Sequence, residues 1–330
     1  MSPGDARGGD VSIDRDDDAL VDHDGDDRAD RDGDDRADRD SIERPEYLPD
    51  PALSREEMES LQRELAAVAT FSDDHGLDPA AVAIAEGADL SGEMPAIASN
   101  DETLDRRTGS SAPVVVGIDQ AFRLDDEEAV SAAVAFRDGR VIEYAHAVTP
   151  LSVPYVPGLL AFREGGPILA ALDALSSDPD LLVFDGSGRI HFREAGIATH
   201  VGVIHDVPSV GVAKGLLCGE PDEPVDERPA GWRTPIRPDD SVETVDGEST
   251  VPASGDGPAS AGSTPVLGYA FQSRQYPNSR RVNPLYVSPG HRVSASTTVD
   301  LVDALCAGHK LPEPTRLADA YADAVKRGNV

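Results

Sequence analysis

The pattern of apolar and polar positions is clearest from residue 113 onward. Val114–Ile118 is a continuous apolar run, which is typical of a buried central strand. Ala129–Phe136 and Val141–Val148 are also apolar, and Asp138-Gly139 between them favours a tight hairpin turn. Two further buried strands are predicted at Asp180–Phe184 and Val207–Val212.

Apolar residues at helical spacing predict helices around these strands. Ser54 and Glu57 have the spacing of a capping box, and the apolar residues from Met58 to Val68 then fall on one helical face. Three more helices are predicted at Gly166–Leu175, Val299–Cys306 and Leu317–Val325. Strands that alternate with helices in this order indicate a mixed α/β layer fold.

Residues 1–45 lack any such pattern. The octapeptide DGDDRADR occurs twice in succession, at 24–31 and at 32–39. The stretch has too little apolar content to offset the entropy of ordering, so we expect a disordered acidic tail. Its Asp-Gly pairs do not have the spacing of an EF-hand calcium loop, and no glutamate closes such a loop.

Two other stretches interrupt the pattern. We expect residues 72–112 to form a polar linker, with one weakly apolar segment near Ala80–Ile84. Between Cys218 and Pro265 the chain is rich in Pro, Asp, Glu, Gly and Ser, which indicates an acidic surface insertion at about 221–264 rather than a separate domain. The expected organisation is therefore a tail at 1–45, a helix and linker at 46–112, and one main domain at 113–330.

The charge of the chain is unusual. Asp and Glu total 62 against 29 Lys and Arg, which gives a formal net charge of −33, and lysine occurs only at Lys214, Lys310 and Lys326. Because about 1 M salt shortens the screening length to about 3 Å, we interpret this surface as adapted to a salt-rich cytoplasm. A disordered tail could alone carry the excess, although the middle of the chain is acidic too. Such an acidic total argues against nucleic acid as a partner, so local sites must decide.

Other compositional features narrow the protein class. The 330 residues contain no run of about 18 apolar residues, so no membrane span is expected. The N-terminus is polar and acidic, unlike a secretory signal. The two cysteines, Cys218 and Cys306, form no CxxC pair. We therefore expect a reduced cytoplasmic protein without a zinc knuckle.

Two predicted strands end in an aspartate. Asp119 follows the first run, and Asp185 follows the strand at 180–184 and precedes Gly186 and Gly188. A carboxylate at the end of a buried strand is costly unless a cation compensates it, although a helix cap or an ion pair can do so as well. Two such carboxylates at one sheet edge are suited to Mg²⁺, which prefers oxygen ligands. Phosphatases and kinases use similar pairs, so the pattern alone leaves the reaction open.

A third segment, PYVPGLLAFRE at 154–164, adds an aromatic residue and a carboxylate. Prolines on both sides hold Tyr155 in an extended turn, where an exposed ring could stack on bases or separate them; the alternative is a packed turn residue. Glu164 ends the segment. Lys214 follows the last predicted strand, where a cation could stabilise a transition state. We interpret His200 and His205 as structural, and leave His291 between a phosphate contact and a structural role.

At this point the chain resembles a known family, endonuclease V, which cuts nucleic acid near deaminated bases, especially inosine. Besides PYVPGLLAFRE, the matching segments are GIDQ at 117–120, DGSGRIHFREAGIATHVG at 185–202, VPSVGVAK at 207–214, NPLYVSPGHRVS at 283–294 and LPEPTRLADA at 311–320. They occur in the order typical of the family. The resemblance covers residues from about 113 to 330 apart from the acidic insertion, and it extends to the helix at Ser54.

The resemblance implies a function and a set of site residues. It implies an RNase H-like mixed sheet flanked by helices, with 113–330 as a catalytic domain that needs Mg²⁺, for which Mn²⁺ can substitute. The enzyme would act in DNA repair as a monomer, cleaving the second phosphodiester bond 3′ of a deaminated base and leaving 5′-phosphate ends. The implied metal ligands are Asp119, Glu164 and Asp185. Further catalytic positions are His191 and Lys214, near the scissile phosphate, and Asp319. The implied contacts to the flipped base are Tyr155 as a wedge, with Leu160, Gly186, Gly188, Gly196 and Ile197 as pocket walls.

The chain departs from the family pattern at a few positions. Ser187 stands where many members have histidine, and Phe192 replaces a frequent proline; both bear on specificity more than on activity. The arginines near the motifs are expected to hold phosphates: Arg163, Arg189, Arg193, Arg292 and Arg316. The alternatives are another RNase H-like nuclease and an inosine-binding protein that does not cleave. The choice between DNA and RNA, the range of lesions and the number of metal ions stay open.

Overall fold

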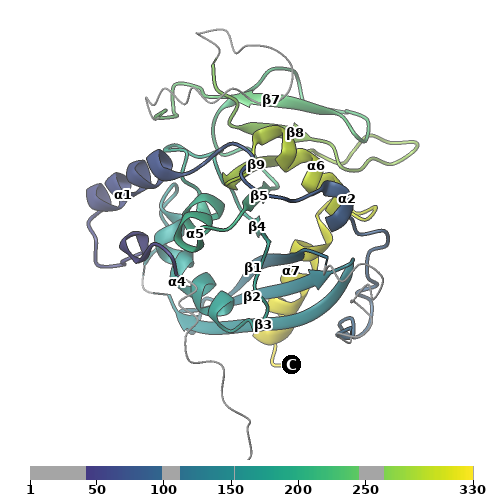
Figure 1. Cartoon of the computed structure of the whole chain (residues 1–330), viewed down its shortest axis with the longest axis horizontal. Helices are drawn as coiled ribbons and strands as arrows, with labels where there is room; N and C mark the ends of the chain where they lie inside the picture. Colours follow the sequence, from purple (N-terminus) through teal and green to yellow (C-terminus); the bar gives the residue numbers. More distant parts are fainter. Residues whose placement is uncertain (1–41, 99–111, 152, 245–263, 330) are drawn as a thin grey trace, which may run out of the picture. The chain divides into compact units, whose positions relative to one another are not determined.

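The computed structural model describes residues 42–98, 112–151, 153–244 and 264–329 (Figure 1). The predicted acidic tail lies almost entirely outside these residues. The helices are the 3₁₀ turn η1 (Pro45–Tyr47), α1 (Arg55–Val68), α2 (Pro79–Val82), α4 (Leu160–Asp173), α5 (Ile197–His205), α6 (Ala295–Leu305) and α7 (Glu313–Lys326). The strands are β1 (Val114–Arg123), β2 (Glu128–Arg137), β3 (Arg140–Pro150), β4 (Leu181–Asp185), β5 (Ser209–Ala213), β6 (Glu220–Pro221), β7 (Arg233–Arg237), β8 (Gly268–Phe271) and β9 (Leu285–His291).

Across the described ranges, the strands form one nine-stranded sheet in the order β3-β2-β1-β4-β5-β9-β8-β7-β6. β1, β2 and β3 form an antiparallel meander, whereas β4 and β5 lie parallel to β1. β9 then returns antiparallel to β5. An antiparallel meander joined to parallel strands through helical crossovers is the predicted RNase H-like mixed sheet, and this prediction is confirmed.

The hairpin between β2 and β3 follows from two residues. Asp138 and Gly139 both have positive φ angles, 52° and 71°, and Arg137 pairs with Arg140 across them. Two consecutive left-handed residues match the right-handed twist of the flanking strands, and Asp-Gly adopts them at little cost. The predicted turn is therefore found at the predicted position.

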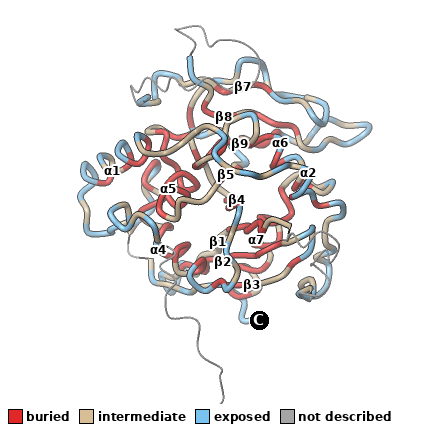
Figure 2. Tube along the Cα trace, viewed as in Figure 1, coloured by how far each residue is buried: buried red, intermediate tan, exposed pale blue. Residues whose placement is uncertain are grey.

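Helices cover both faces of the sheet because its central strands are apolar on both faces. In β1, Val115 packs toward α6 and α7, while Val116 and Ile118 pack toward α4 and α5. Leu181 and Leu182 of β4 divide in the same way. Buried residues follow the central strands and the inward sides of the helices (Figure 2). This explains why these strands read as continuous apolar runs.

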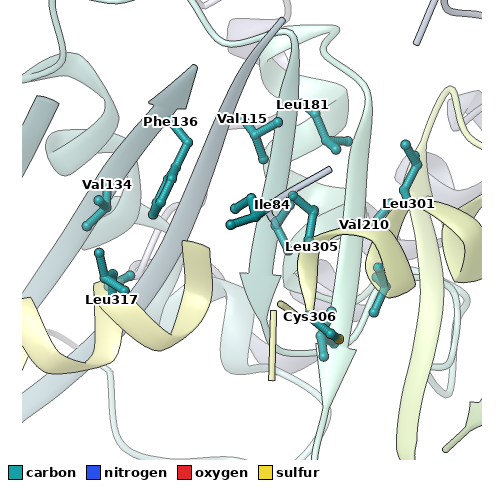
Figure 3. Close-up of a cluster of buried hydrophobic side chains, with 14 of the residues drawn as sticks. Ile84, Val115, Val134, Phe136, Leu181, Val210, Leu301, Leu305, Cys306 and Leu317 are labelled. Carbon is teal, nitrogen blue, oxygen red and sulfur yellow. The ribbon is translucent and has the colours of Figure 1, made fainter. Parts of the chain in front are cut away.

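The expected linker at 72–112 packs on the domain instead, over the part that the structure describes. Val82 and Ile84 are buried, and Figure 3 shows Ile84 among the core side chains of β1, β4 and α6. The backbone N–H of Ile84 donates to the carbonyl of Ala304 at 3.0 Å. Few apolar residues make these contacts, so hydropathy alone does not reveal them.

The acidic insertion also differs from its expected form. Part of it extends the sheet as β6 and β7, with Ile236 fully buried against Leu267 and Cys218. In β7, Pro235 interrupts the alternation of polar and apolar residues, which hides this short strand in the sequence. Residues 245–263 lie outside the described part of the chain.

One predicted helix, α1, begins at its expected capping box, and another, α4, begins earlier than expected. Ser54 accepts from the N–H of Glu57, and the Glu57 side chain accepts from the N–H of Ser54, so the capping box is confirmed. α4 begins at Leu160 rather than Gly166, because Gly165, Gly166 and Pro167 obscure a helix that packing maintains. Glu164 therefore lies on the first turns of α4.

None of the helices in the described ranges is long and apolar enough to cross a membrane.

Candidate active site

Two aspartates lie side by side at the carboxyl ends of neighbouring strands. Ile118 of β1 pairs with Phe184 of β4 in parallel register, so the next residues, Asp119 and Asp185, are adjacent. β4 ends at Asp185, whereas β1 continues along β2 alone. The edge where parallel strands end is where α/β sheets place their ligands.

Lys214 and Asp319 complete this group, and we call the four residues the carboxylate edge. Lys214 follows β5, and its Nζ lies 2.5 Å from Oδ2 of Asp185. Asp319 lies on α7, which approaches β1 closely at Gly117, where a Cβ would overlap with the backbone of Pro314. The glycine in GIDQ thus allows α7 to bring a third carboxylate to the other two.

The pKa values of these groups show a site with excess negative charge. Burial, together with the charges of Asp185 and Asp319, raises the pKa of Asp119 to about 8, against the N–H of Gln120 and the charge of Lys214. Burial also raises the pKa of Asp319. For Lys214, burial lowers the pKa, but the hydrogen bond and charge of Asp185 outweigh it, so the net pKa is raised. One ammonium does not balance three carboxylates.

Glu164 lies apart from this group. Burial raises its pKa to about 7, and the charge of Arg163 opposes this change. Its backbone carbonyl accepts a hydrogen bond from Nε2 of Gln120, next to Asp119, at 3.3 Å. In the part of the chain that the structure describes, no three His, Cys, Asp or Glu side chains are close enough together to hold a metal ion. The structure thus brings together two of the three expected metal ligands, Asp119 and Asp185, and pairs Asp185 with Lys214.

A pocket of about 80 Å³ lies beside the carboxylate edge. Four of the six expected substrate contacts line it: Tyr155, Leu160, Gly196 and Ile197. Ser187, two residues after Asp185, lines it as well, which places the pocket next to the carboxylates. Tyr155 is 65% exposed, so its ring is free to contact a ligand.

Gln62 of α1 is a pocket residue that the sequence analysis missed. It is fully buried, its Nε2 donates to the carbonyl of Gly158 at 2.9 Å, and its Oε1 accepts from Arg193 at 3.2 Å. The hydrogen bond to Gly158 fixes the loop that carries Tyr155. A glutamine on the apolar side of an amphipathic helix was the available signal.

Gly186 and Gly188 lie at points of close packing. Neither lines the pocket. A Cβ on Gly188 would overlap with the carbonyl of Pro289 on β9, and one on Gly186 would lie 2.6 Å from Ile197. These glycines therefore allow close packing behind the pocket, while Gly196 both lines it and contacts Ser187.

His191 lies in the wall of the pocket. It is 4% exposed, and its Nδ1 accepts from the N–H of Arg193 at 3.3 Å. Burial lowers its pKa to about 4, helped by the charge of Arg193. The structure therefore places a neutral, buried imidazole in the pocket wall.

Most of the arginines expected to hold phosphates are paired with carboxylates. Arg189 pairs with Glu194 at 3.1 Å, Arg193 with Glu59 at 3.0 Å, Arg292 with Asp74 at 3.3 Å and Arg316 with Glu313 at 2.7 Å. Arg163 has no carboxylate partner among the described residues and lies 6.0 Å from the ring of Tyr155. Four of the five arginines thus stabilise the fold, which their proximity to motifs in the sequence did not reveal.

The histidines interpreted as structural have structural contacts. Nε2 of His200 lies 2.7 Å from the carbonyl of Tyr47. His291, which the sequence left open, bridges Asp206 at 2.9 Å and the backbone N–H of Thr70 at 3.1 Å. It therefore joins β9 to the segment after α1.

Comparison with known proteins identifies the family. A sequence model described as Endonuclease V matches residues 98–320. The chain belongs to the endonuclease V family. It is 56% identical to an endonuclease V of Halobacterium salinarum over 85% of this chain and 98% of that one. A halophilic relative of such similarity agrees with the predicted salt-adapted source.

Solved structures of endonuclease V have the same fold. The enzyme of Streptomyces avermitilis is 29% identical, covers 84% of this chain and 95% of its own, and gives a TM-score of 0.57. An endonuclease V of Ciona intestinalis, in complex with DNA that contains an inosine, is 22% identical and covers 83% of this chain and 97% of its own, with a TM-score of 0.56. At this identity the second likeness concerns the fold alone.

Proposed function

We propose that this endonuclease V is a metal-dependent enzyme that binds a deaminated base, inosine above all, and cleaves the second phosphodiester bond on its 3′ side. The proposal rests on one observation: the carboxylate edge and the pocket lie next to each other at the end of β4. Asp185 belongs to the carboxylate edge, and Ser187, two residues later, lines the pocket. A base held in the pocket therefore keeps its own backbone near the carboxylates. The Ciona enzyme bound to inosine-containing DNA supports this choice of base.

The carboxylates of the carboxylate edge fit a hard divalent cation, and we propose Mg²⁺, for which Mn²⁺ can substitute. Their ligand atoms are all oxygens. Burial and neighbouring carboxylates raise the pKa values of Asp119 and Asp319, and a cation would relieve this cost of charge. Mg²⁺ needs only one or two carboxylates, since water and substrate phosphates supply the other ligands. Asp119 and Asp185 would hold the ion, with Glu164 as the third proposed ligand. When bound, the ion would supply positive charge to the phosphate and acidify a water molecule.

The remaining residues have roles that their contacts support. Lys214 is free to leave Asp185 for a phosphate oxygen once a cation neutralises that carboxylate, and it would then stabilise charge in the transition state. Asp319 would keep Lys214 directed toward the edge. Tyr155 would replace the flipped base in the stack, at a cost of about a few kcal/mol for unstacking.

The pocket would select its base by shape and by backbone contacts. Its walls include Gly196, Ile197 and Ala195, which leave little room for an additional group. Ser187 offers a hydroxyl at the position where many family members have histidine. An inosine is easier to remove from a duplex than a normal base because it pairs more weakly. Both DNA and RNA could present it, and we propose DNA as the substrate, in a monomeric, cytoplasmic repair enzyme.

The test is cleavage of end-labelled single strands and duplexes, each with one inosine, in concentrated KCl with Mg²⁺. Matched RNA strands, inosine-free strands and reactions with a chelator run in parallel, and a sizing gel locates the cut. The proposal expects a cut at the second bond 3′ of inosine only when metal is present. Cleavage of inosine-free strands at an equal rate would contradict base recognition. Cleavage with chelator would contradict the metal.

A further inference from the structure

The hairpin at residues 272–284, between β8 and β9, is a second cationic region of the molecule. We call it the arginine hairpin, because Arg274, Arg280 and Arg281 are all exposed on it. It projects from the sheet beyond β8 in Figure 1. None of the three arginines has a carboxylate partner among the described residues. In a chain of 62 acidic residues, three neighbouring cations without such a partner are exceptional.

The sheet places this hairpin on the same edge as the carboxylates. β9 is antiparallel to β5, with Tyr286 opposite Ala213, so the start of β9 lies beside Lys214. β8 is antiparallel to β9, with Phe271 opposite Leu285. The loop that joins them therefore lies at the carboxyl end of β5, where Lys214 is.

Lys310 extends the positive charge between the two regions. Its carbonyl accepts a hydrogen bond of 2.6 Å from Oγ of Ser273, the residue before Arg274. The charge of Lys214 also lowers the pKa of Lys310, after the larger effect of burial, which indicates that the two ammonium groups are near each other. Two of the three lysines of the protein are thus near each other, one at the carboxylate edge and one on a segment that contacts the arginine hairpin.

The hairpin keeps its shape without its arginines. Nε2 of Gln272 donates to the carbonyls of Arg274 and Val282, at 2.7 and 2.9 Å. The side chain of Gln275 both donates to the carbonyl of Val282 and accepts from its N–H. Tyr276, 51% exposed, stands near the tip with Arg274 5.6 Å from its ring. Nη1 of Arg280 donates to the carbonyl of Glu227 at 3.1 Å, which occupies one of its donors. The three guanidinium groups are on exposed residues and keep further donors for a ligand.

We propose that the arginine hairpin binds the backbone of the substrate strand on the 3′ side of the cleavage site, with Tyr276 as a stacking surface for a base. Rows of cations with an aromatic ring are what single-stranded nucleic acid requires of a protein. The direction follows from the proposed function, on which this inference rests. The pocket that holds the base lies on the α4 and α5 side of the carboxylate edge. Because the cut at this edge is on the 3′ side of the base, the rest of the substrate strand continues past Lys214 toward the arginine hairpin.

The test compares Arg280→Gln/Arg281→Gln with the wild type on two inosine-containing single strands. Their 5′ arms are identical, and the 3′ arm is either about 12 nucleotides or about 3. The charge-matched control is Arg55→Gln/Arg327→Gln, which changes two exposed arginines far from the site in sequence. KM and kcat are measured in about 0.5 M KCl, and KM again over a salt series.

For the wild type, we expect KM to rise roughly tenfold when the 3′ arm is shortened, with kcat unchanged. The hairpin variant should show the raised KM with both strands, and a shallower salt dependence of KM on the long strand. The control should behave as the wild type. Equal KM values for hairpin variant and wild type on the long strand would overturn the inference. A wild type that does not cut at inosine would instead overturn the proposed function, and this inference with it.

Discussion

The carboxylate edge and the pocket meet at Asp185–Ser187 but are stabilised in opposite ways. At the edge, carboxylates lie close together, and burial and like charge raise the pKa of Asp119 to about 8. The pocket wall is instead closely packed, with glycines at points where a Cβ would overlap with neighbouring backbone. The edge stores electrostatic strain that a cation would relieve, whereas the pocket has little freedom to change shape. Substitutions at the edge should therefore change activity more than stability, and substitutions behind the pocket should do the reverse.

The largest effect is expected from Asp185→Asn. The amide keeps the shape but removes the charge that pairs with Lys214 and would hold a metal ion, so kcat should fall about 10³-fold. Cleavage rates under single-turnover conditions measure this, with binding of uncleaved inosine DNA measured separately. Asp173→Asn, an exposed residue at the end of α4, is the matched control. If Asp185→Asn lost as much binding as cleavage, the carboxylate edge would contribute to binding as well as to catalysis. The proposed contrast between the edge and the pocket would then be wrong.

The converse is expected for Gly188→Ala. Its Cβ would overlap with the carbonyl of Pro289, and the backbone of β9 cannot yield as a flexible side chain does. We expect a loss of about 2–3 kcal/mol in the free energy of unfolding. Chemical denaturation at constant KCl measures it. Gly166→Ala, where a Cβ meets nothing within 4 Å, is the control and should be neutral or slightly stabilising in its helix. Equal effects at the two glycines would show that the pocket wall is not closely packed.

A smaller effect is expected from Tyr155→Ala. The ring is largely exposed, so its loss should hardly alter stability, but a stacking contact of about 1–3 kcal/mol would disappear. The ratio of kcat/KM for inosine-containing over inosine-free strands should fall about tenfold. Tyr155→Phe should retain nearly all of it, since the phenol oxygen makes no hydrogen bond to the described residues. Retention by the alanine variant would mean that the ring is not a wedge.

Much of the fold could be predicted because short segments of the sequence indicate the element that they form. The strands at Val114 and Leu181 are apolar throughout, and Asp138-Gly139 leaves few turn conformations. The segment around Ile84 was expected to be a linker because its apolar residues are few. Only Val82 and Ile84 are buried in the core, and Leu77, Ala88, Leu90 and Met94 pack against it partly buried. Pro235 concealed β7, and Pro167 the start of α4. In each case tertiary packing overrides the local signal.

The candidate site was less predictable than the fold. Motif position indicated Asp119 and Asp185 correctly as neighbours, because parallel register brings strand ends together. It could not show whether an arginine faces a phosphate or a carboxylate, as with Arg193 and Glu59, because the partner lies more than 100 positions away in the sequence. The same holds for Gln62, which contacts Gly158 across the pocket. The spacing of residues within a motif does not predict contacts between distant parts of the chain.

The smallest effect concerns pH and His200, which lies behind the pocket. Burial lowers its pKa to about 4, although the carbonyl of Tyr47 opposes this change. The unfolded chain takes up a proton at His200 as the pH falls through about 6.5, but the folded protein does not until about pH 4. The contribution of neutral His200 to stability is therefore complete above about pH 6.5 and is lost as the pH falls toward 4. Relative to His200→Gln, the wild type should lose about 1 kcal/mol between pH 8 and pH 5.5.

Denaturation at constant KCl across this pH range measures the difference between the two proteins. The comparison cancels the opposite contribution of Asp119, whose raised pKa means that the folded state holds a proton that the unfolded state has released. His309→Asn, on the partly exposed turn before α7, is the control and should keep the pH dependence of the wild type. If the free energies of unfolding of the wild type and of His200→Gln changed equally with pH, His200 would be accessible to water. The region behind the pocket would then not be closely packed, and its contrast with the carboxylate edge would be wrong.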